Sequence, residues 1–433
     1  MSPSRTATHQ PSAASDAQPE WYRGLHNVWL PYAAMKSARP FPVVRTQGSR
    51  ITLADGRELI DGIASWWTAC HGYNHPHIAA AVTSQLAVMP HVMLGGLVHE
   101  PALTLARRLA ALLPGDLDHV FFSDSGSVAV EVAMKMAVQY WINRGIGGRT
   151  RFVAFKDGYH GDTTGAMALC DPASGMHRLF QGVLPQQHIL DLPVDEESAA
   201  ALDAFLERYA HEIAGIVVEP LVQGAGGLKL HDGEVLRRLR ITAERYDLLL
   251  IFDEIFTGFG RTGTMFASEG AEVVPDIITL SKALTGGTLS LAATIASRKV
   301  FDAFWSDDPA RALMHGPTYM ANALACASAN ASLDLFESEP RLQQVEAISQ
   351  QMTSELASCR DLPGVVDVRV RGAIGVVELQ RIEDLAGLRA RFVEEGVFIR
   401  PFGNVVYLTP AFTIAPDELS RLTAAIGRVL TKS

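Results

Sequence analysis

The chain has 433 residues, of which 48% are hydrophobic and 19% are charged, and its formal net charge is −10 at pH 7. This length suits two domains with a large core, and the composition is that of a globular protein. The acidic balance argues against non-specific binding to nucleic acid or to an anionic membrane surface. No apolar stretch approaches the length of a membrane span. We therefore expect neither nucleic acid nor a membrane as a partner.

The chain opens with a segment unlike the rest. Residues 1–20 are rich in Ser, Ala, Pro and Thr and lack an apolar run, which predicts a disordered tail rather than a secretory signal. The cysteines are far apart and form no CxxC motif, so we expect free thiols in a reducing cytoplasm. They are Cys70, Cys170, Cys326 and Cys359.

Both flanks of the chain predict an α+β arrangement. Residues 43–62 predict a β-hairpin with its turn at Asp55-Gly56. After residue 364 short apolar runs alternate with two helical patterns, at 384–395 and 416–431. The runs are VVDVRVRG, IGVVELQ, VFIRP and VVYLTP.

The central part of the chain alternates between short apolar runs and helical patterns. Continuous apolar strands that alternate with helices predict a mostly parallel sheet covered on both faces. The strand candidates are HVFFS at 119–123, RFVAF, GIVVEP at 215–220, LLLIFDE, IITLS at 277–281 and LAATIAS at 291–297. The helix candidates are the segment 126–141, TTGAMAL and EVLRRLRITAERY.

These patterns predict an α/β protein with two domains. We expect a tail at 1–20, a large central domain at 75–318, and a smaller domain built from both chain ends, 21–74 and 319–433.

Chemically distinctive residues follow three of the predicted strands. Asp253 ends LLLIFD, Lys282 follows IITLS, and Gly126-Ser127 open the helix after HVFFS. Ligands of open parallel sheets bind at the carboxyl ends of the strands. An amine for a Schiff base, a carboxylate for a pyridine nitrogen and a helix N-terminus for a phosphate together suit pyridoxal phosphate. Taken singly, each residue is more often a turn, cap or solvated residue.

Longer motifs carry a resemblance to a known family. LLLIFDEIFTGFGRTG, PDIITLSKALTGG, SDSGSVAVEVAMKMAVQYW and GYHGDT resemble the class III aminotransferases of fold type I, and the similarity covers nearly the whole chain after the tail. The resemblance implies a pyridoxal-phosphate-dependent aminotransferase. It also implies a large domain with a mostly parallel seven-stranded sheet and a smaller α+β domain.

Two features narrow the resemblance. Trp66-Trp67 and MHGPTYMAN resemble the branch of this class that acts in biotin biosynthesis. This branch implies transamination of 8-amino-7-oxononanoate to 7,8-diaminononanoate with S-adenosylmethionine as amino donor, although a lysine-using variant stays open. Another class III enzyme acting on an ω-amino acid is the first alternative. A non-catalytic or metal-dependent α/β protein that uses His71, His75 and His77 is the second.

The resemblance also implies residue roles. Lys282 matches the Schiff-base lysine, Asp253 the partner of the pyridinium nitrogen, and Tyr159 the ring that stacks on the cofactor and borders the substrate. Gly126 and Ser127 match phosphate-binding positions. Glu254, next to Asp253, is expected to have a structural role.

Further roles implied by the resemblance concern the substrate and a second subunit. Pro317 and Thr318 match residues that reach the phosphate of the other subunit's cofactor, which implies a homodimer with shared active sites. Arg400 matches the arginine that receives a substrate carboxylate, for which a guanidinium fork is suited. The remaining substrate-binding matches are Tyr32, Trp66 and Gly316.

The chain departs from the family pattern at three positions. Phe256 stands where a small residue is usual, Ala323 where proline is usual, and Cys70 where isoleucine is common. A phenylalanine at 256 is expected to narrow the space near the cofactor. Other enzyme classes find little support, since GAGG at 224–227 is not a dinucleotide fingerprint and no GxSxG motif is present.

Overall fold

A computed structural model describes residues 19–172, 177–180 and 182–431 of the chain. The predicted tail at 1–20 therefore lies outside the described residues, apart from Pro19 and Glu20. Glu20 begins a 3-10 helix, η1 (Glu20–Asn27).

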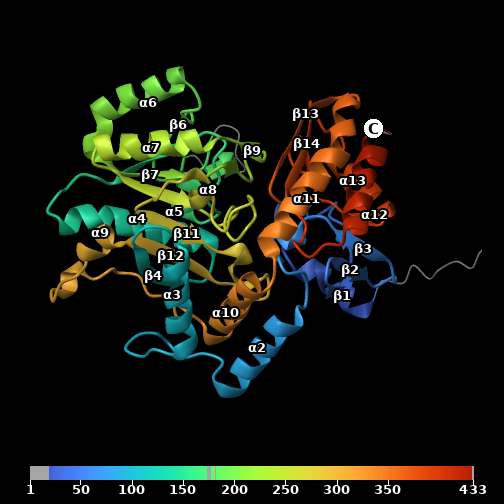
Figure 1. The fold of residues 1–433 in the computed structure, drawn as a ribbon, viewed down its shortest axis with the longest axis horizontal. Coiled ribbons are helices and arrows are strands. Elements are labelled where there is room, and N and C mark those ends of the chain that lie inside the picture. The colour runs from blue at the N-terminus through green and yellow to red at the C-terminus, as the bar shows by residue number, and fades with distance from the viewer. Residues whose placement is uncertain (1–18, 173–176, 181, 432–433) are drawn as a thin grey trace, which may run out of the picture.

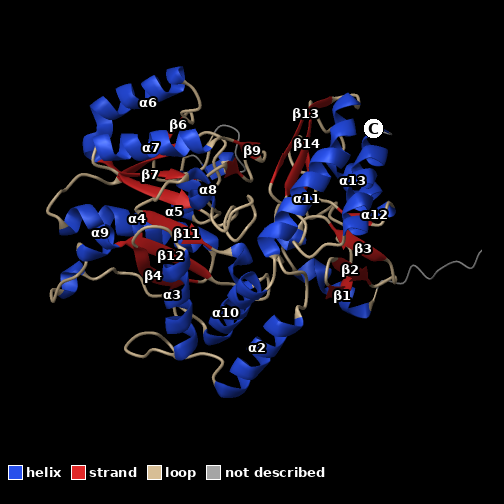
Figure 2. Cartoon of the chain, viewed as in Figure 1, coloured by secondary structure: helices blue, strands red, loops and turns tan. Residues whose placement is uncertain are grey.

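A seven-stranded sheet forms the centre of the larger body (Figures 1 and 2). Its strands lie in the order β4-β12-β11-β10-β7-β5-β6. All run in one direction except β12, which is antiparallel to both of its neighbours. Their bounds are β4 (Leu117–Ser123), β5 (Arg151–Phe155), β6 (His188–Leu190), β7 (Ile213–Val218), β10 (Leu249–Asp253), β11 (Ile277–Leu280) and β12 (Ala292–Ser297).

The strands of this sheet are apolar because both faces of the sheet are buried. Every residue of β7, β10, β11 and β12 is buried. Along β10, Leu250 and Phe252 belong to one core cluster, whereas Leu249 and Ile251 belong to the cluster on the other face. This alternation is the period of two expected of a strand. The mostly parallel α/β sheet predicted from the sequence is thereby confirmed.

Helices cover both faces of the sheet, as Figure 2 shows. Buried residues of α4 (Gly126–Asn143) join one core cluster and those of α7 (Gly233–Arg245) join the other. The other helices of this body are α2 (Pro76–Val88), α3 (Glu100–Leu112), α5 (Thr164–Ala168), α6 (Glu196–Tyr209), α8 (Ala267–Ala271), α9 (Arg298–Asp302) and α10 (Ala323–Ser338). A small hairpin, β8 (Val222–Gln223) with β9 (Lys229–Leu230), follows β7.

A second body joins the two ends of the chain, drawn in blue and in orange to red in Figure 1. Strand β15 (Val397–Phe398) pairs in parallel with β3 (Glu58–Asp61), completing the sheet β1-β2-β3-β15 with β1 (Val43–Gln47) and β2 (Arg50–Leu53). Strands β13 (Val365–Arg371), β14 (Ile374–Leu379) and β16 (Val405–Leu408) form a separate sheet. Helices α11 (Arg341–Leu356), α12 (Leu385–Glu394) and α13 (Pro416–Thr431) accompany these strands.

Helix α10 packs against α2 and α3, on the side of the larger body. Its first residue is Ala323, and Asn322 caps it by accepting hydrogen bonds from the Leu324 and Ala325 amides. The departure from proline at 323 thus leaves the helix start intact. The exact domain boundaries remain a prediction.

Two further features concern the chain as described. The four cysteines are free and buried. None of the described helices is long and apolar enough to cross a membrane.

Candidate active site

One edge of the large sheet gathers the residues with distinctive chemistry. Strands β4, β5, β7, β10 and β11 run in the same direction, so their carboxyl ends share this edge. Asp253 pairs with Thr279 on β11, and Lys282 follows three residues later. The strand-end positions predicted from the sequence are therefore neighbours in the fold.

Asp253 is a buried carboxylate with several hydrogen-bond partners. Its Oδ2 lies 2.7 Å from Nδ1 of His160, which follows β5 and is also buried. Its Oδ1 accepts from the Ile255 amide at 3.1 Å and from the Thr279 hydroxyl at 3.3 Å. Burial disfavours the charged imidazole, but the hydrogen bond and charge of Asp253 outweigh that effect and raise the pKa of His160.

A second buried carboxylate, Glu219, lies beyond the end of β7. It accepts from the Tyr159 amide at 3.0 Å and from the Gly224 amide at 2.9 Å. Burial, with the nearby charge of Asp253 as a smaller cause, raises the pKa of Glu219 to about 7. The carboxylate fixes the backbone that carries Tyr159.

Lys282 begins the short 3-10 helix η4 (Lys282–Thr285) and has a φ of +46°. Its Nζ lies 4.4 Å from the ring centroid of Trp67 and 5.7 Å from that of Phe256. Within the described chain its amine makes no hydrogen bond and no ion pair. The residue keeps some solvent exposure, yet burial lowers the pKa of its amine to about 8, against the opposing charges of Asp253 and Glu219.

The N-terminus of α4 lies beside the loop that carries Tyr159 and His160. Ser125 caps the helix by accepting from the Val128 amide, and the Ser127 hydroxyl accepts from the Thr163 amide at 2.9 Å. Gly161 makes this approach possible, since it has a φ of +128° and a Cβ there would lie 2.3 Å from the Ser127 hydroxyl. An 18-residue helix that begins with Gly126 and Ser127 suits an anion at its N-terminus.

Tyrosines border the site on the loop side. Tyr159 donates to Asp162 at 3.0 Å, and Tyr32 also donates to Asp162. His177 completes the group with Nε2 at 2.9 Å from the same carboxylate. Burial, Asp162 and the neighbouring hydroxyl raise the pKa of Tyr159, and burial with the Asp162 hydrogen bond raises that of Tyr32 to about 12. Both phenols therefore stay protonated at neutral pH.

The second body contributes Trp66 and Arg400. Parallel pairing of β3 with β15 sets Asp61 opposite Phe398, so the segments that follow these strands run together. There the guanidinium carbon of Arg400 lies 4.8 Å from the Trp66 ring centroid. Trp66 is 38% exposed whereas Trp67 is 7% exposed, so the adjacent tryptophans face different surroundings.

The other acidic residue of the Asp253-Glu254 pair has a structural environment. Glu254 is fully buried and accepts from the amides of Ala267 and Ser268 at 2.7 and 2.8 Å, at the start of α8. Burial raises its pKa to about 7. Its contacts agree with the expectation that Glu254 is not a reacting group.

The segment Gly316, Pro317 and Thr318 is not joined to these residues by any hydrogen bond or ion pair among the described residues. Residues 316–318 follow the segment 311–314, whose backbone carbonyls accept hydrogen bonds from side chains of α4. Gln139 donates to the Ala312 carbonyl at 2.8 Å, Asn143 donates to the Arg311 carbonyl at 3.1 Å, and Lys135 donates to the Met314 carbonyl. Thr318 itself is exposed.

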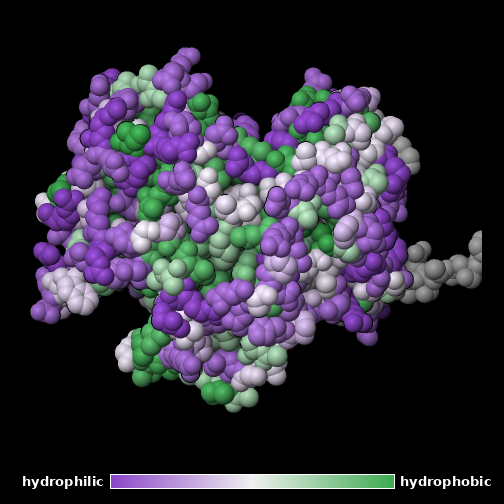
Figure 3. All heavy atoms as spheres, viewed as in Figure 1, coloured by the Kyte–Doolittle hydropathy of each residue, from purple (hydrophilic) through white to green (hydrophobic). Residues whose placement is uncertain are grey.

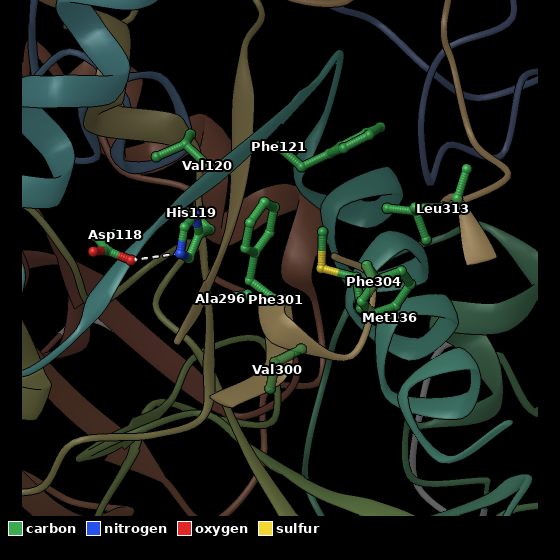
Figure 4. Close-up of a pocket in the computed structure, with 11 residues that line it drawn as sticks. Asp118, His119, Val120, Phe121, Met136, Ala296, Val300, Phe301, Phe304 and Leu313 are labelled. Atoms are coloured by element: carbon green, nitrogen blue, oxygen red, sulfur yellow. Dashed lines mark ion pairs between the residues drawn. The ribbon is translucent and has the colours of Figure 1, made fainter. Parts of the chain in front are cut away.

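The structure also bears on the alternative sites. A cavity of about 360 Å³ lies between β4, α4 and α9 (Figure 4), where His119 stacks on Phe301 and pairs with Asp118 at 2.9 Å. It is largely apolar and includes none of the strand-end residues above.

The predicted alternative metal site at His71, His75 and His77 lacks a metal-ligand geometry. Both ring nitrogens of His71 are engaged, by Arg341 and by Ser332 at 3.0 Å each. No group of three metal-ligating side chains occurs in the part of the chain that is described.

Three residues that sequence reasoning did not assign to the site now belong to it. His160 contacts Asp253, Glu219 supports Tyr159, and Trp67 faces Lys282. The sequence contained a signal for each of these three residues. His160 lies within GYHGDT, Glu219 lies near the end of the predicted strand 215–220, and Trp67 is half of the tryptophan pair.

Comparison with known proteins identifies the family. The family model for class III aminotransferases matches residues 32–430. The chain belongs to the class III aminotransferases. Three proteins that are similar to this chain show the range of the family.

A Mycobacterium leprae protein named adenosylmethionine-8-amino-7-oxononanoate aminotransferase is 46% identical over 93% of this chain and 94% of its own length. The crystal structure of the enzyme of that name from Methanocaldococcus jannaschii has a TM-score of 0.90 at 31% identity, with 96% and 98% of the two chains covered. An amine transaminase from an uncultivated Pseudomonas species, solved in its PLP-bound form, has a TM-score of 0.87 at 31% identity, with coverage of 96% and 100%.

The residues of this class III chain fit the cofactor that the class implies. The buried Asp253 offers a negative charge, Lys282 offers an amine without an ion-pair partner in the described chain, and the α4 N-terminus offers amides. These are the groups that pyridoxal phosphate needs for its pyridine nitrogen, its aldehyde and its phosphate.

Covalent attachment of the cofactor to Lys282 is the first test. Borohydride reduction of protein incubated with pyridoxal phosphate should add a stable label at Lys282, detected by peptide mass spectrometry. The Lys282→Ala variant should give no label in the corresponding peptide, while Lys299→Ala, which removes an amine paired with Asp276 before the start of β11, should label normally. Labelling of another lysine in place of Lys282 would contradict the assignment.

Proposed function

We propose that this class III aminotransferase converts 8-amino-7-oxononanoate to 7,8-diaminononanoate, with S-adenosylmethionine as amino donor, in biotin biosynthesis. The observation that carries the proposal is the 46% identity, over 93% of the chain, to a relative named for those substrates. The solved structures alone do not discriminate, because the amine transaminase and the M. jannaschii enzyme are both 31% identical. The buried free cysteines support a location in the reducing cytoplasm.

Pyridoxal phosphate, when bound, supplies an aldehyde that receives the amino group and a ring that accepts electrons. Asp253 would hold the ring nitrogen protonated, with His160 orienting its carboxylate. The first amides of α4 and the hydroxyl of Ser127 would hold the phosphate. Tyr159 would lie against the ring, on backbone held by Glu219.

Lys282 would then transfer protons between the substrates as a general base and acid. With a pKa of about 8, its amine is neutral in about one molecule in ten at pH 7, a fraction far larger than for an ordinary lysine. A neutral Nζ can take a proton from the Cα of the amino donor and later return one to the acceptor.

Substrate recognition would fall to Arg400, Trp66 and the tyrosines. The acceptor has a carboxylate at the end of an aliphatic chain, and a guanidinium is suited to bind it. Stacking on Trp66 orients Arg400 without consuming its hydrogen-bond donors. Tyr32, Tyr159 and the Trp66 ring offer aromatic contact to a sulfonium-bearing donor and to the apolar chain of the acceptor. Gly316 is proposed to border the substrate from the neighbouring subunit.

Product formation tests the function directly. Purified protein supplied with pyridoxal phosphate and 8-amino-7-oxononanoate should form 7,8-diaminononanoate when S-adenosylmethionine is added, as detected by mass spectrometry. Reactions with lysine, with a simple ω-amino acid and without donor serve as controls. Formation of the diamine with lysine alone would identify lysine as the amino donor. Transfer of an amino group to other acceptors but not to 8-amino-7-oxononanoate would favour the ω-amino-acid alternative and overturn the proposal.

We also infer a homodimer in which each subunit completes the other's site. Apolar side chains are exposed between α2 and α3, and Figure 3 shows such side chains gathered at the bottom of the view. They include Met93, Leu97 and Val98, together with Val88 at the end of α2. The ring centroid of His91 in this segment lies 4.7 Å from that of Tyr319, so the exposed apolar segment adjoins Pro317 and Thr318. An exposed apolar area of this kind marks a protein interface.

Mixing of inactive variants tests whether sites are shared. Lys282→Ala and Thr318→Ala subunits, each weakly active alone, should regain activity when they exchange. In a mixed dimer one site carries both lesions and the other carries neither. Subunit exchange is confirmed separately by differently tagged chains. Exchange without any recovery of activity would show that Thr318 does not serve the partner's site.

A further inference from the structure

We propose that Phe256 is a positioning residue, whose ring packs with Trp67 to keep water from the Lys282 amine and so increases the fraction in the uncharged, reactive form. This deepens the proposed function by assigning the residue that prepares the lysine. It rests on the geometry around Lys282 and requires no particular substrate.

Phe256 is held firmly beside the lysine. It follows Asp253 by three residues, is 5% exposed, and its ring centroid lies 4.1 Å from that of Trp67. The backbone of Gly224 also approaches the ring so closely that a Cβ there would lie 2.8 Å from the Phe256 ring. Contact with both Trp67 and Gly224 restrains the buried ring beside Lys282.

The two rings act on the amine in different ways. Nζ lies 4.4 Å from the Trp67 centroid, where a cation is attracted to an aromatic face, and this contact favours the charged form. Phe256 lies 5.7 Å away, close to the limit of about 6 Å for that attraction. Its main contribution is therefore apolar volume that water would otherwise occupy, which favours the neutral form.

The charged groups around the lysine oppose this effect. Asp253 on β10 and Glu219 after β7 both favour the ammonium, and His160 pairs with Asp253. Tyr407 of β16 packs against Trp67 at 6.3 Å between centroids, and its pKa is raised chiefly by burial, so it is uncharged. Burial nevertheless prevails, since the pKa of Lys282 is lowered. Phe256 is uncharged, so its removal changes the hydration of the amine and leaves these charges in place.

The test measures the titration of Lys282 without any substrate. Full-length protein freed of cofactor is labelled with acetic anhydride across a pH series, and the labelled Lys282 peptide is quantified by mass spectrometry. Phe256→Ala should raise the midpoint by about one pH unit or more, which is about a tenfold smaller neutral fraction at pH 7. Phe256→Leu, which keeps part of the volume, should give a smaller rise.

Phe259→Leu is the matched control. Phe259 lies in the same loop and is 1% exposed, but its ring packs against Phe266 and Phe336. This variant should leave the Lys282 midpoint unchanged, which separates shielding of the amine from a general loss of a buried ring. An unchanged or lowered midpoint in Phe256→Ala, with Phe256→Leu agreeing, would overturn the proposal.

Failure of this proposal and failure of the proposed function give different results. A raised midpoint in a protein that forms no diamine would support the role of Phe256 while rejecting the substrates. Diamine formation with an unchanged midpoint would support the substrates while rejecting the role of Phe256. In the active enzyme, the acidic limb of the pH-rate profile should move to higher pH in Phe256→Ala by the same amount as the labelling midpoint.

Discussion

The hydrogen bond between Asp253 and His160 is the interaction on which the rest of the site depends. Both side chains are buried, and a buried carboxylate without a partner would cost several kcal/mol. The bond ties the loop after β5 to the end of β10, two strands apart in the sheet. From that loop, Gly161 and Thr163 pack on Ser127, so the carboxylate, Tyr159 and the α4 N-terminus hold a common geometry.

A second constraint is a strained turn at the junction with the smaller body. Ala64 to Trp67 have consecutive φ values between +43° and +74°, a left-handed conformation that costs about 1–2 kcal/mol per residue. The Asp61 carboxylate supports this turn by accepting from the amides of Ile63 and Ser65 at 2.8 and 3.1 Å. The turn directs Trp67 toward Lys282 and Trp66 toward Arg400. Lys282 and Tyr32 also have positive φ, as strained residues at functional sites often do.

Much of this arrangement could be predicted from the sequence because strand ends determine it. The apolar run before Asp253 and the run before Lys282 became the adjacent parallel strands β10 and β11, so placing both residues at one edge followed from the fold class. The antiparallel direction of β12 could not be predicted in the same way. An apolar run indicates burial on both faces, but it contains no information about the direction of the strand.

Contacts between distant residues were the other part that sequence reasoning missed. His160 and Asp253 are 93 positions apart, and no local pattern pairs them. The packing of Trp67 against Phe256 depends on the left-handed turn at 64–67, which contains no glycine that would predict positive φ. The meeting of Trp66 with Arg400 depends on the β3–β15 pairing of the two chain ends. In each case a long-range contact, rather than a local preference, selected the geometry.

We propose that the charge of Asp253, whose carboxylate is held by His160, enables the reaction. The most direct measurement is the turnover of Asp253→Asn with S-adenosylmethionine and 8-amino-7-oxononanoate, alongside its cofactor content and thermal unfolding midpoint. An amide oxygen can still accept from His160 but cannot hold a pyridine nitrogen protonated. We therefore predict a folded protein whose turnover falls by orders of magnitude even when it is saturated with cofactor. A turnover near that of the unaltered protein would contradict the account.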